Sequence, residues 1–220
     1  MSRTAIDARR LAPVCCLIAA LGLAASSRAD PQSEARAAPL PNRARVDTSL
    51  GSFIIQLETA RAPLTVANFA SYVRSGFYEG TILHRVIANF VVQGGGYNAK
   101  FQLQPTTTTV ANESGNGLSN KRGTVGLART ELPHSGNAQF YVNLTDNDDL
   151  DPTPVRWGYA VFGRIVEGME VVDRIGRTPT GAVGPWPKDA PLDPVVIKRI
   201  EILPLAGAAP AAAPAPATAR

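Results

Sequence analysis

Cysteine and histidine are scarce in this 220-residue chain. It contains two of each, and both cysteines, Cys15 and Cys16, lie in the first thirty residues. Beyond that segment the chain offers no thiolate for a disulfide, a metal site or nucleophilic catalysis. His84 and His134 are too few for the usual histidine-based metal sites, so we expect no metal and no cofactor.

Long apolar runs are also rare. The stretch Leu11–Ala25 has about fifteen uncharged residues, fewer than the roughly 20 that a membrane-spanning helix needs. It follows three arginines and precedes small residues, which is the pattern of a cleaved secretory signal over residues 1–29. Such a signal predicts a periplasmic protein with no stable membrane insertion after cleavage. An uncleaved N-terminal anchor is the alternative, because Arg28 is unusual beside a cleavage site.

The net charge of the chain is small once residues 1–29 are set apart. The formal net charge is +4, but residues 1–29 hold four of the 22 basic and one of the 18 acidic residues, leaving a net charge of +1 on the rest. The high isoelectric point therefore reflects the export signal and gives no argument for a nucleic-acid partner.

Aromatic residues make up only 6% of the chain, and much of its apolar content is alanine. Residues 206–220 (AGAAPAAAPAPATAR) have no large side chain to bury, which predicts a disordered Ala/Pro-rich tail. Residues 30–43 have a similar composition and are predicted to be a linker. The remaining segment, 44–205, has the size of one ordinary domain, which we expect to be monomeric.

Most of this domain is predicted to be short strands. Residues 45–48 and 52–57 flank a turn and form an expected hairpin. Apolar residues at helical spacing predict helices over 63–73 and 166–175. The other predicted strands cover 81–87, 90–93, 124–128, 139–144, 159–162 and 194–203. This order indicates a mostly β domain, an antiparallel barrel or sandwich with helices packed against it.

Five ordered motifs resemble the cyclophilins. The segment Leu83-His84-Arg85-Val86-Ile87, followed by Phe90 and Gln93-Gly94-Gly95, is similar to that family's signature. The others are Ala62-Pro63 with Asn68-Phe69 and Gly76-Phe77-Tyr78, then Arg122–Arg129, Ala138–Asn143 and Tyr159–Gly163. The resemblance implies a closed eight-stranded antiparallel β-barrel capped by two α-helices. It also implies peptidyl-prolyl cis-trans isomerase activity on unfolded or partly folded proteins with X-Pro bonds.

The resemblance also implies roles for individual residues. Arg85 is the expected catalytic donor to the prolyl nitrogen of the twisted amide. Gln93 and Gln139 are expected to support Arg85, and Gln93 also to bind the substrate backbone, while Ala128 and Arg129 contact the residues before proline. His84 is expected to fix the strand beside Arg85. The expected walls of the proline pocket are Phe90, Val91, Tyr141 and Leu150, with Tyr159 where the family has a pocket histidine.

Three positions depart from the family pattern. Val91 replaces a more usual methionine, Tyr159 replaces the histidine, and Asp149 stands where many eukaryotic members have a cyclosporin-binding tryptophan. These differences resemble the bacterial periplasmic branch. They predict an active isomerase that binds cyclosporin poorly.

Other classes of function stay open at this point. The domain is alternatively a proline-peptide binding module or a holdase chaperone whose catalysis is incidental. A small-molecule barrel of the lipocalin type would leave Arg85 and Gln93 unexplained. A hydrolase is weakly supported, because the chain has no Gly-x-Ser-x-Gly motif and no cysteine after residue 29.

Overall fold

Residues 41–204 are the part of the chain that the structure, a computed structural model, describes. The expected signal peptide and Ala/Pro-rich tail lie outside the described residues, as does most of the expected linker. Eight antiparallel strands form the main sheet, in the order β12-β1-β2-β9-β7-β8-β5-β4. Their bounds are β1 Arg43–Thr48, β2 Gly51–Leu57, β4 Arg85–Ile87, β5 Val91–Gly94, β7 Thr124–Leu127, β8 Phe140–Asn143, β9 Val161–Glu167 and β12 Ile197–Ile202.

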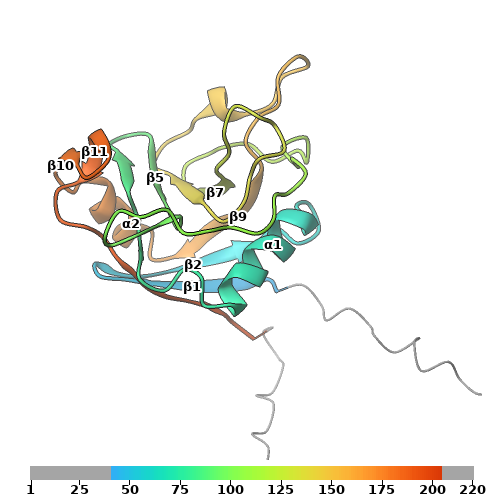
Figure 1. Cartoon of the computed structure of the whole chain (residues 1–220). Coiled ribbons are helices and arrows are strands. Elements are labelled where there is room, and N and C mark those ends of the chain that lie inside the picture. Colours follow the sequence, from blue (N-terminus) through green and yellow to red (C-terminus); the bar gives the residue numbers. More distant parts are fainter. Residues whose placement is uncertain (1–40, 205–220) are drawn as a thin grey trace, which may run out of the picture. The chain divides into compact units, whose positions relative to one another are not determined.

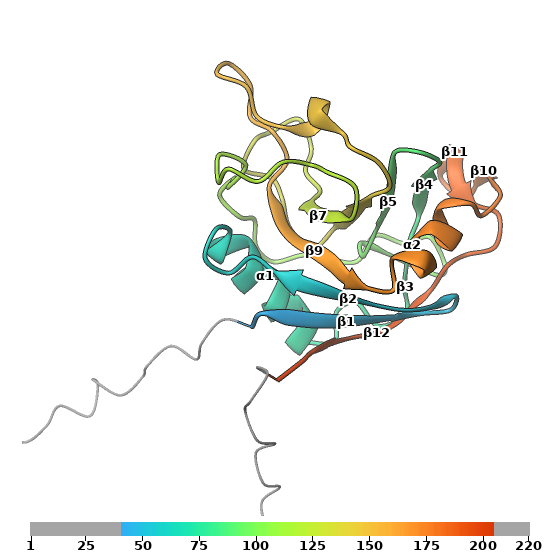
Figure 2. The ribbon, with the colours of Figure 1, turned by 180° about the vertical axis from the view of Figure 1, so that it is seen from behind.

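Two helices flank this sheet, α1 (Pro63–Arg74) and α2 (Met169–Gly176). They lie toward opposite sides of the domain, and the views from front and back agree on this (Figures 1 and 2). The buried face of α1 carries Phe69, whose ring centroid lies 5.5 Å from that of Tyr78 and 5.3 Å from that of Phe162. The Phe69 ring also lies 5.9 Å from that of Phe140, so the aromatic cluster joins the helix to β9 and β8 and forms part of one core.

The N-terminus of α1 is capped by a distant residue. Ala62 precedes the helix and has no side chain that can accept a hydrogen bond. Instead, the Glu113 carboxylate accepts bonds from the amides of Leu64 and Thr65 and from the Thr65 hydroxyl, at 3.1, 2.8 and 2.6 Å. A negative group is favourable there because the first amides of a helix are unpaired and carry partial positive charge.

The prediction of a closed barrel was wrong, because the eight-stranded sheet is open. The predicted strand 81–87 is interrupted at Leu83 and His84 into β3 (Thr81–Ile82) and β4. The β4 half pairs only with β5, while the β3 half pairs with β6 (Tyr97–Asn98) and makes one isolated bridge from Ile82 to Val196. Since the two halves have different partners, no continuous ladder joins β4 to β12.

Two further predictions needed correction. The helix expected over 166–175 begins at Met169, because β9 continues to Glu167 and Gly168 makes the turn with φ = 83°. A hairpin of β10 (Thr180–Val183) and β11 (Trp186–Pro191) was not foreseen. Its glycines and prolines are typical of loops, and they hid the short strands. The β1–β2 hairpin and α1 were predicted within one or two residues of each end.

Candidate active site

A cavity of about 230 Å³ opens where β4, β5, β7 and β8 lie side by side. Four of its side chains come from the strands, and the rest come from the segments that lead into or out of them. All nine lining residues are among those that the sequence indicated: Arg85, Phe90, Val91, Gln93, Ala128, Arg129, Tyr141, Leu150 and Tyr159. The structure therefore brings together residues that are up to 74 positions apart in the chain.

The polar side of the cavity is a chain of three side chains. Arg85 on β4 and Gln93 on β5 are direct cross-strand partners, which places them on one face of the sheet. Arg85 Nη1 donates to Gln93 Oε1 at 3.3 Å, and Gln93 Nε2 donates to Gln139 Oε1 at 3.3 Å. Gln93 thereby holds the guanidinium at the edge of the cavity, while the remaining N–H groups of Arg85 stay available for a ligand.

Tyr141 forms the apolar floor of the site. Its side chain is 4% exposed, and its ring lies against Gly126, its partner across the β7–β8 ladder. The hydroxyl donates to Asn120 Oδ1 at 2.6 Å. Burial raises the pKa of Tyr141 well above its usual value, so the phenol stays neutral and acts only as a donor and a wall.

Sequence reasoning missed the polar network beneath this floor. Asn120 receives bonds from Tyr141 and Asn143 and donates to the Asp151 carboxylate at 2.8 Å. Asn147 Nδ2 donates to Asn143 Oδ1 at 2.7 Å and to the Phe90 carbonyl at 3.0 Å. The network ties three loops to β8 and so positions the pocket walls. Asparagines in loops, such as Asn120 and Asn147, normally indicate turns, and no local pattern distinguishes these two. Asn143 ends β8, and its partners are not evident from the sequence.

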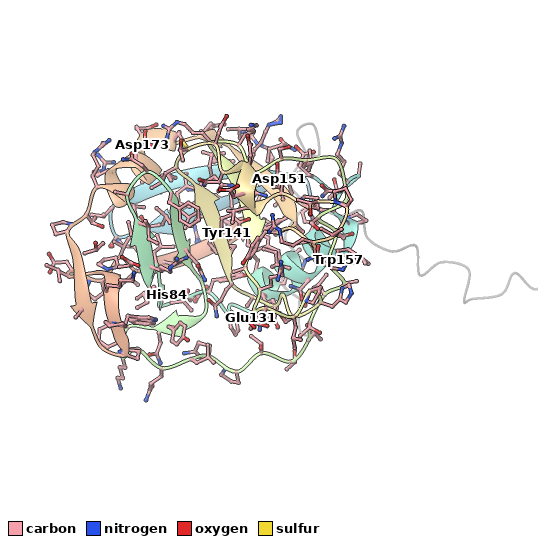
Figure 3. The ribbon with its side chains drawn as sticks, turned by 90° about the horizontal axis from the view of Figure 1, so that it is seen from above. His84, Glu131, Tyr141, Asp151, Trp157 and Asp173 are labelled. Atoms are coloured by element: carbon pink, nitrogen blue, oxygen red, sulfur yellow. The ribbon has the colours of Figure 1, made fainter. Side chains whose placement is uncertain are left out.

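Two predicted residues do not line the cavity. Gln139 lines an adjoining hollow of about 180 Å³, together with Gln93, Ala128 and Arg129. His84 is 5% exposed and stacks on Trp186 of β11, with ring centroids 5.2 Å apart. Figure 3 shows Tyr141 near the middle of the site, with His84 toward the β10–β11 hairpin and Trp157 in the opposite direction.

The charge at the site is positive. Arg85 and Arg129 both line the cavity, and none of the nine lining residues is acidic. Across residues 41–204, no group of three or more His, Cys, Asp or Glu side chains is placed to hold a metal ion. A larger hollow of about 410 Å³ runs along the exposed segment 152–157 and includes none of the predicted site residues.

The fold matches solved cyclophilin structures. A cyclophilin-type isomerase from Cryptosporidium parvum superposes with a TM-score of 0.62 at 23% identity, covering 75% of this chain and 99% of that one. This likeness defines the fold class, a mostly β cyclophilin fold with two helices.

Sequence comparison then shows the family. The family model for cyclophilin-type peptidyl-prolyl cis-trans isomerases matches residues 43–202. The cyp18 isomerase of Streptomyces antibioticus is 48% identical over 161 residues, which cover 72% of this chain and 96% of that protein. Isomerase A of Dickeya dadantii is 44% identical over 171 residues, which cover 78% and 90% respectively. The chain belongs to the cyclophilin-type peptidyl-prolyl cis-trans isomerases and is an enzyme of that class, so the lipocalin alternative is wrong.

Proposed function

We propose that this enzyme accelerates X-Pro isomerisation in exported proteins, with the proline ring in the 230 Å³ cavity and Arg85 as the catalytic donor. The observation that carries the proposal is the cavity lining, in which one held guanidinium faces a set of apolar walls. The X-Pro barrier is about 18–20 kcal/mol because rotation breaks amide resonance. A thousandfold acceleration requires only about 4 kcal/mol, which one preorganised donor and a shaped pocket supply.

The donor acts on the twisted amide more strongly than on the planar one. As the bond rotates, the prolyl nitrogen recovers its lone pair and becomes a hydrogen-bond acceptor. A guanidinium N–H directed at that nitrogen therefore stabilises the transition state preferentially, which raises kcat. Arginine suits the role because it is always charged and its planar fork also reaches the substrate carbonyl.

The other residues of the site bind the substrate or support Arg85. Phe90, Val91, Tyr141 and Leu150 enclose the proline ring, with Tyr159 completing the wall. Gln93 orients Arg85 and binds substrate backbone, and Gln139 supports Gln93. Ala128 and Arg129 contact the residues before proline, partly through their main chain. His84 directly precedes β4, next to Arg85, and its buried ring keeps the start of that strand in place.

The proposed compartment is the periplasm, and the enzyme acts there as a monomer. The support is the export pattern of residues 1–29 and the lack of any cysteine beyond them. The two proteins reported above as 48% and 44% identical are bacterial. No helix among the described residues is long and apolar enough to cross a membrane.

The test is the isomerisation rate of a proline-containing tetrapeptide with wild type, Arg85→Ala and Arg85→Lys. We expect Arg85→Ala to lower kcat on the order of a hundredfold, the loss typical of removing one preorganised donor. Arg85→Lys also loses most activity, because an ammonium cannot reproduce the planar fork. Arg164→Ala is the matched control, since Arg164 is an exposed arginine of β9 paired with Glu58.

Equal rates for wild type and Arg85→Ala would remove Arg85 from the reaction. Peptide binding by the wild type without any rate enhancement would instead support the alternative, a proline-peptide binding module or holdase. Thermal unfolding of each variant shows whether a loss of rate reflects a loss of fold.

A further inference from the structure

The Arg129 side chain is bound almost entirely by the protein itself. A guanidinium has five N–H donors. Arg129 Nη2 donates to the Trp157 carbonyl at 2.8 Å and Nε donates to the Gly158 carbonyl at 3.1 Å. Nη1 donates to the carbonyls of Thr130 and Glu131 at 2.8 and 3.3 Å. Four donors are thus used on backbone, and little hydrogen-bonding capacity remains for a substrate.

The flat face of the same guanidinium covers a wall of the proline pocket. The Arg129 Cζ atom lies 4.4 Å from the centroid of the Tyr159 ring, within the range of a cation–π contact. The Tyr159 ring also meets the ring of Tyr141 edge-on, with centroids 6.0 Å apart. The position of the Tyr159 ring therefore depends on these two neighbours.

The segment before Tyr159, residues 152–157, is exposed along its whole length. It forms a loop that projects into solvent, as Figures 1 and 2 both show. Val155 at its tip is 96% exposed, and Trp157 is 47% exposed. Ser114 and Asn112 bind the backbone of Gly158, and the Tyr159 amide donates to the Leu150 carbonyl at 2.9 Å. The bond from Arg129 is the one that holds the Trp157 carbonyl.

We propose that the Arg129 side chain is a positioning residue: it binds the backbone of Trp157 and Gly158 and holds the Tyr159 ring as a wall of the proline pocket. The proposal rests on the proposed pocket and adds a role that differs from contact with substrate. The wall meets the proline ring in both planar and twisted states of the peptide bond. A mobile Tyr159 ring weakens the binding of the ground state and of the transition state by the same amount. This raises KM and leaves kcat nearly unchanged.

Arg129→Lys separates positioning from charge. Lysine keeps the positive charge, but one ammonium cannot span four carbonyls and has no flat face for the ring. We expect Arg129→Lys and Arg129→Gln both to raise KM about fivefold, with kcat within about twofold of wild type. Arg199→Lys, a substitution of an exposed arginine on β12, is the matched control and leaves both constants unchanged. A wild-type KM in Arg129→Lys with a raised KM in Arg129→Gln would overturn the proposal in favour of a charge effect.

A double-mutant cycle tests whether Arg129 acts through Tyr159. Tyr159→Leu removes the ring that the guanidinium holds, so Arg129→Lys in that background has little left to change. We expect the double variant to have a KM within about twofold of Tyr159→Leu alone. Additive effects of the two substitutions would overturn the proposal.

Quenching of Trp157 fluorescence provides a readout independent of activity. In a Trp186→Phe background, Trp157 is the one remaining tryptophan of the chain. We expect Arg129→Lys to increase its quenching by acrylamide, because the segment is released. Unchanged quenching together with an unchanged KM would also overturn the proposal. The failure of Arg85→Ala to lower kcat would overturn the proposed catalytic donor and leave this result intact.

Discussion

Gly126 and Tyr141 face each other across the β7–β8 ladder, and the site depends on the missing side chain of Gly126. A Cβ atom there would lie 2.2 Å from Cζ of Tyr141 and 2.3 Å from its hydroxyl oxygen. The ring occupies the space above the glycine, and this places the hydroxyl on Asn120 and the ring edge in the cavity.

The residue-scale prediction is Gly126→Ala. The methyl group forces the Tyr141 ring out of its place, and overpacking of this kind typically costs about 1–3 kcal/mol of stability. We expect kcat/KM to fall about tenfold, because the floor of the pocket moves. Urea unfolding and the tetrapeptide assay measure the two effects.

Gly115→Ala is the matched control, because a Cβ at Gly115 would meet nothing within 4 Å. We expect it to change neither stability nor rate. Wild-type activity in Gly126→Ala would show that Tyr141 does not need this position.

At the residue scale, the sequence indicated the cavity residues through the ordered motifs that resemble the cyclophilins. Arg85 followed by Phe90 and Gln93 forms part of an ordered motif, so all nine cavity residues could be named before the fold was seen. Asn120, Asn143 and Asn147 could not, because their roles follow from burial and from partners distant in the chain. The side-chain partners of Arg129 could not be foreseen either, because the Trp157 carbonyl that accepts one of its bonds lies 28 residues away.

At the scale of elements, the β10–β11 hairpin packs over the start of β4. Trp186 of β11 stacks on His84, and Tyr97 lies against both rings. This places a histidine in an apolar setting next to the charge of Arg85. Burial, and secondly the charge of Arg85, lower the pKa of His84 to about 4.

The element-scale prediction is a dependence of stability on pH. Above pH 6.5, the model-peptide value, His84 is neutral in both the folded and unfolded states. Between pH 6.5 and 4 the unfolded state binds a proton that the folded state does not, so stability falls with falling pH. The expected loss is about 3 kcal/mol, measured by urea unfolding across this range.

His84→Phe keeps a ring in the stack and removes the titration, so we expect this part of the pH dependence to disappear. Tyr97→Phe serves as the control, because it keeps a ring against His84 and leaves the histidine in place. An identical pH profile for wild type and His84→Phe would contradict the assigned burial of His84.

The elements most accurately predicted were those with strong local patterns. The β1–β2 hairpin has a glycine at its turn, and α1 has apolar residues at helical spacing with Pro63 in its first turn. The interruption at Leu83 and His84 has no local signal, because both residues suit a strand. It exists because Ile82 and Leu83 bond to the segment before β12 while Arg85 pairs with Gln93.

At the scale of the whole molecule, the described core is self-contained. Its buried apolar residues extend from Ala44 to Ile200 and form one cluster. The pocket residues all fall within the same range. A chain consisting of residues 41–204 therefore contains both the packing and the site.

The whole-molecule prediction is that residues 41–204, produced alone, fold and catalyse. We expect kcat/KM for the tetrapeptide to stay within about twofold of the longer chain from Asp30 to Arg220, since a twofold change is only about 0.4 kcal/mol. Thermal unfolding is the second measurement and should give the same midpoint. A loss of fold or rate would show that the flanking segments contribute to the domain.

The sequence by itself indicated the family, through its resemblance to the cyclophilins, and with the family the nine residues that line the cavity. The signal peptide and the tail stay predictions. The tertiary structure decided whether the sheet closes, which asparagines support the pocket and what Arg129 binds. These features depend on which distant segments meet and on how many hydrogen-bond donors each contact uses. The local sequence does not indicate which segments meet or which donors are used, because burial and pairing arise only when the strands assemble.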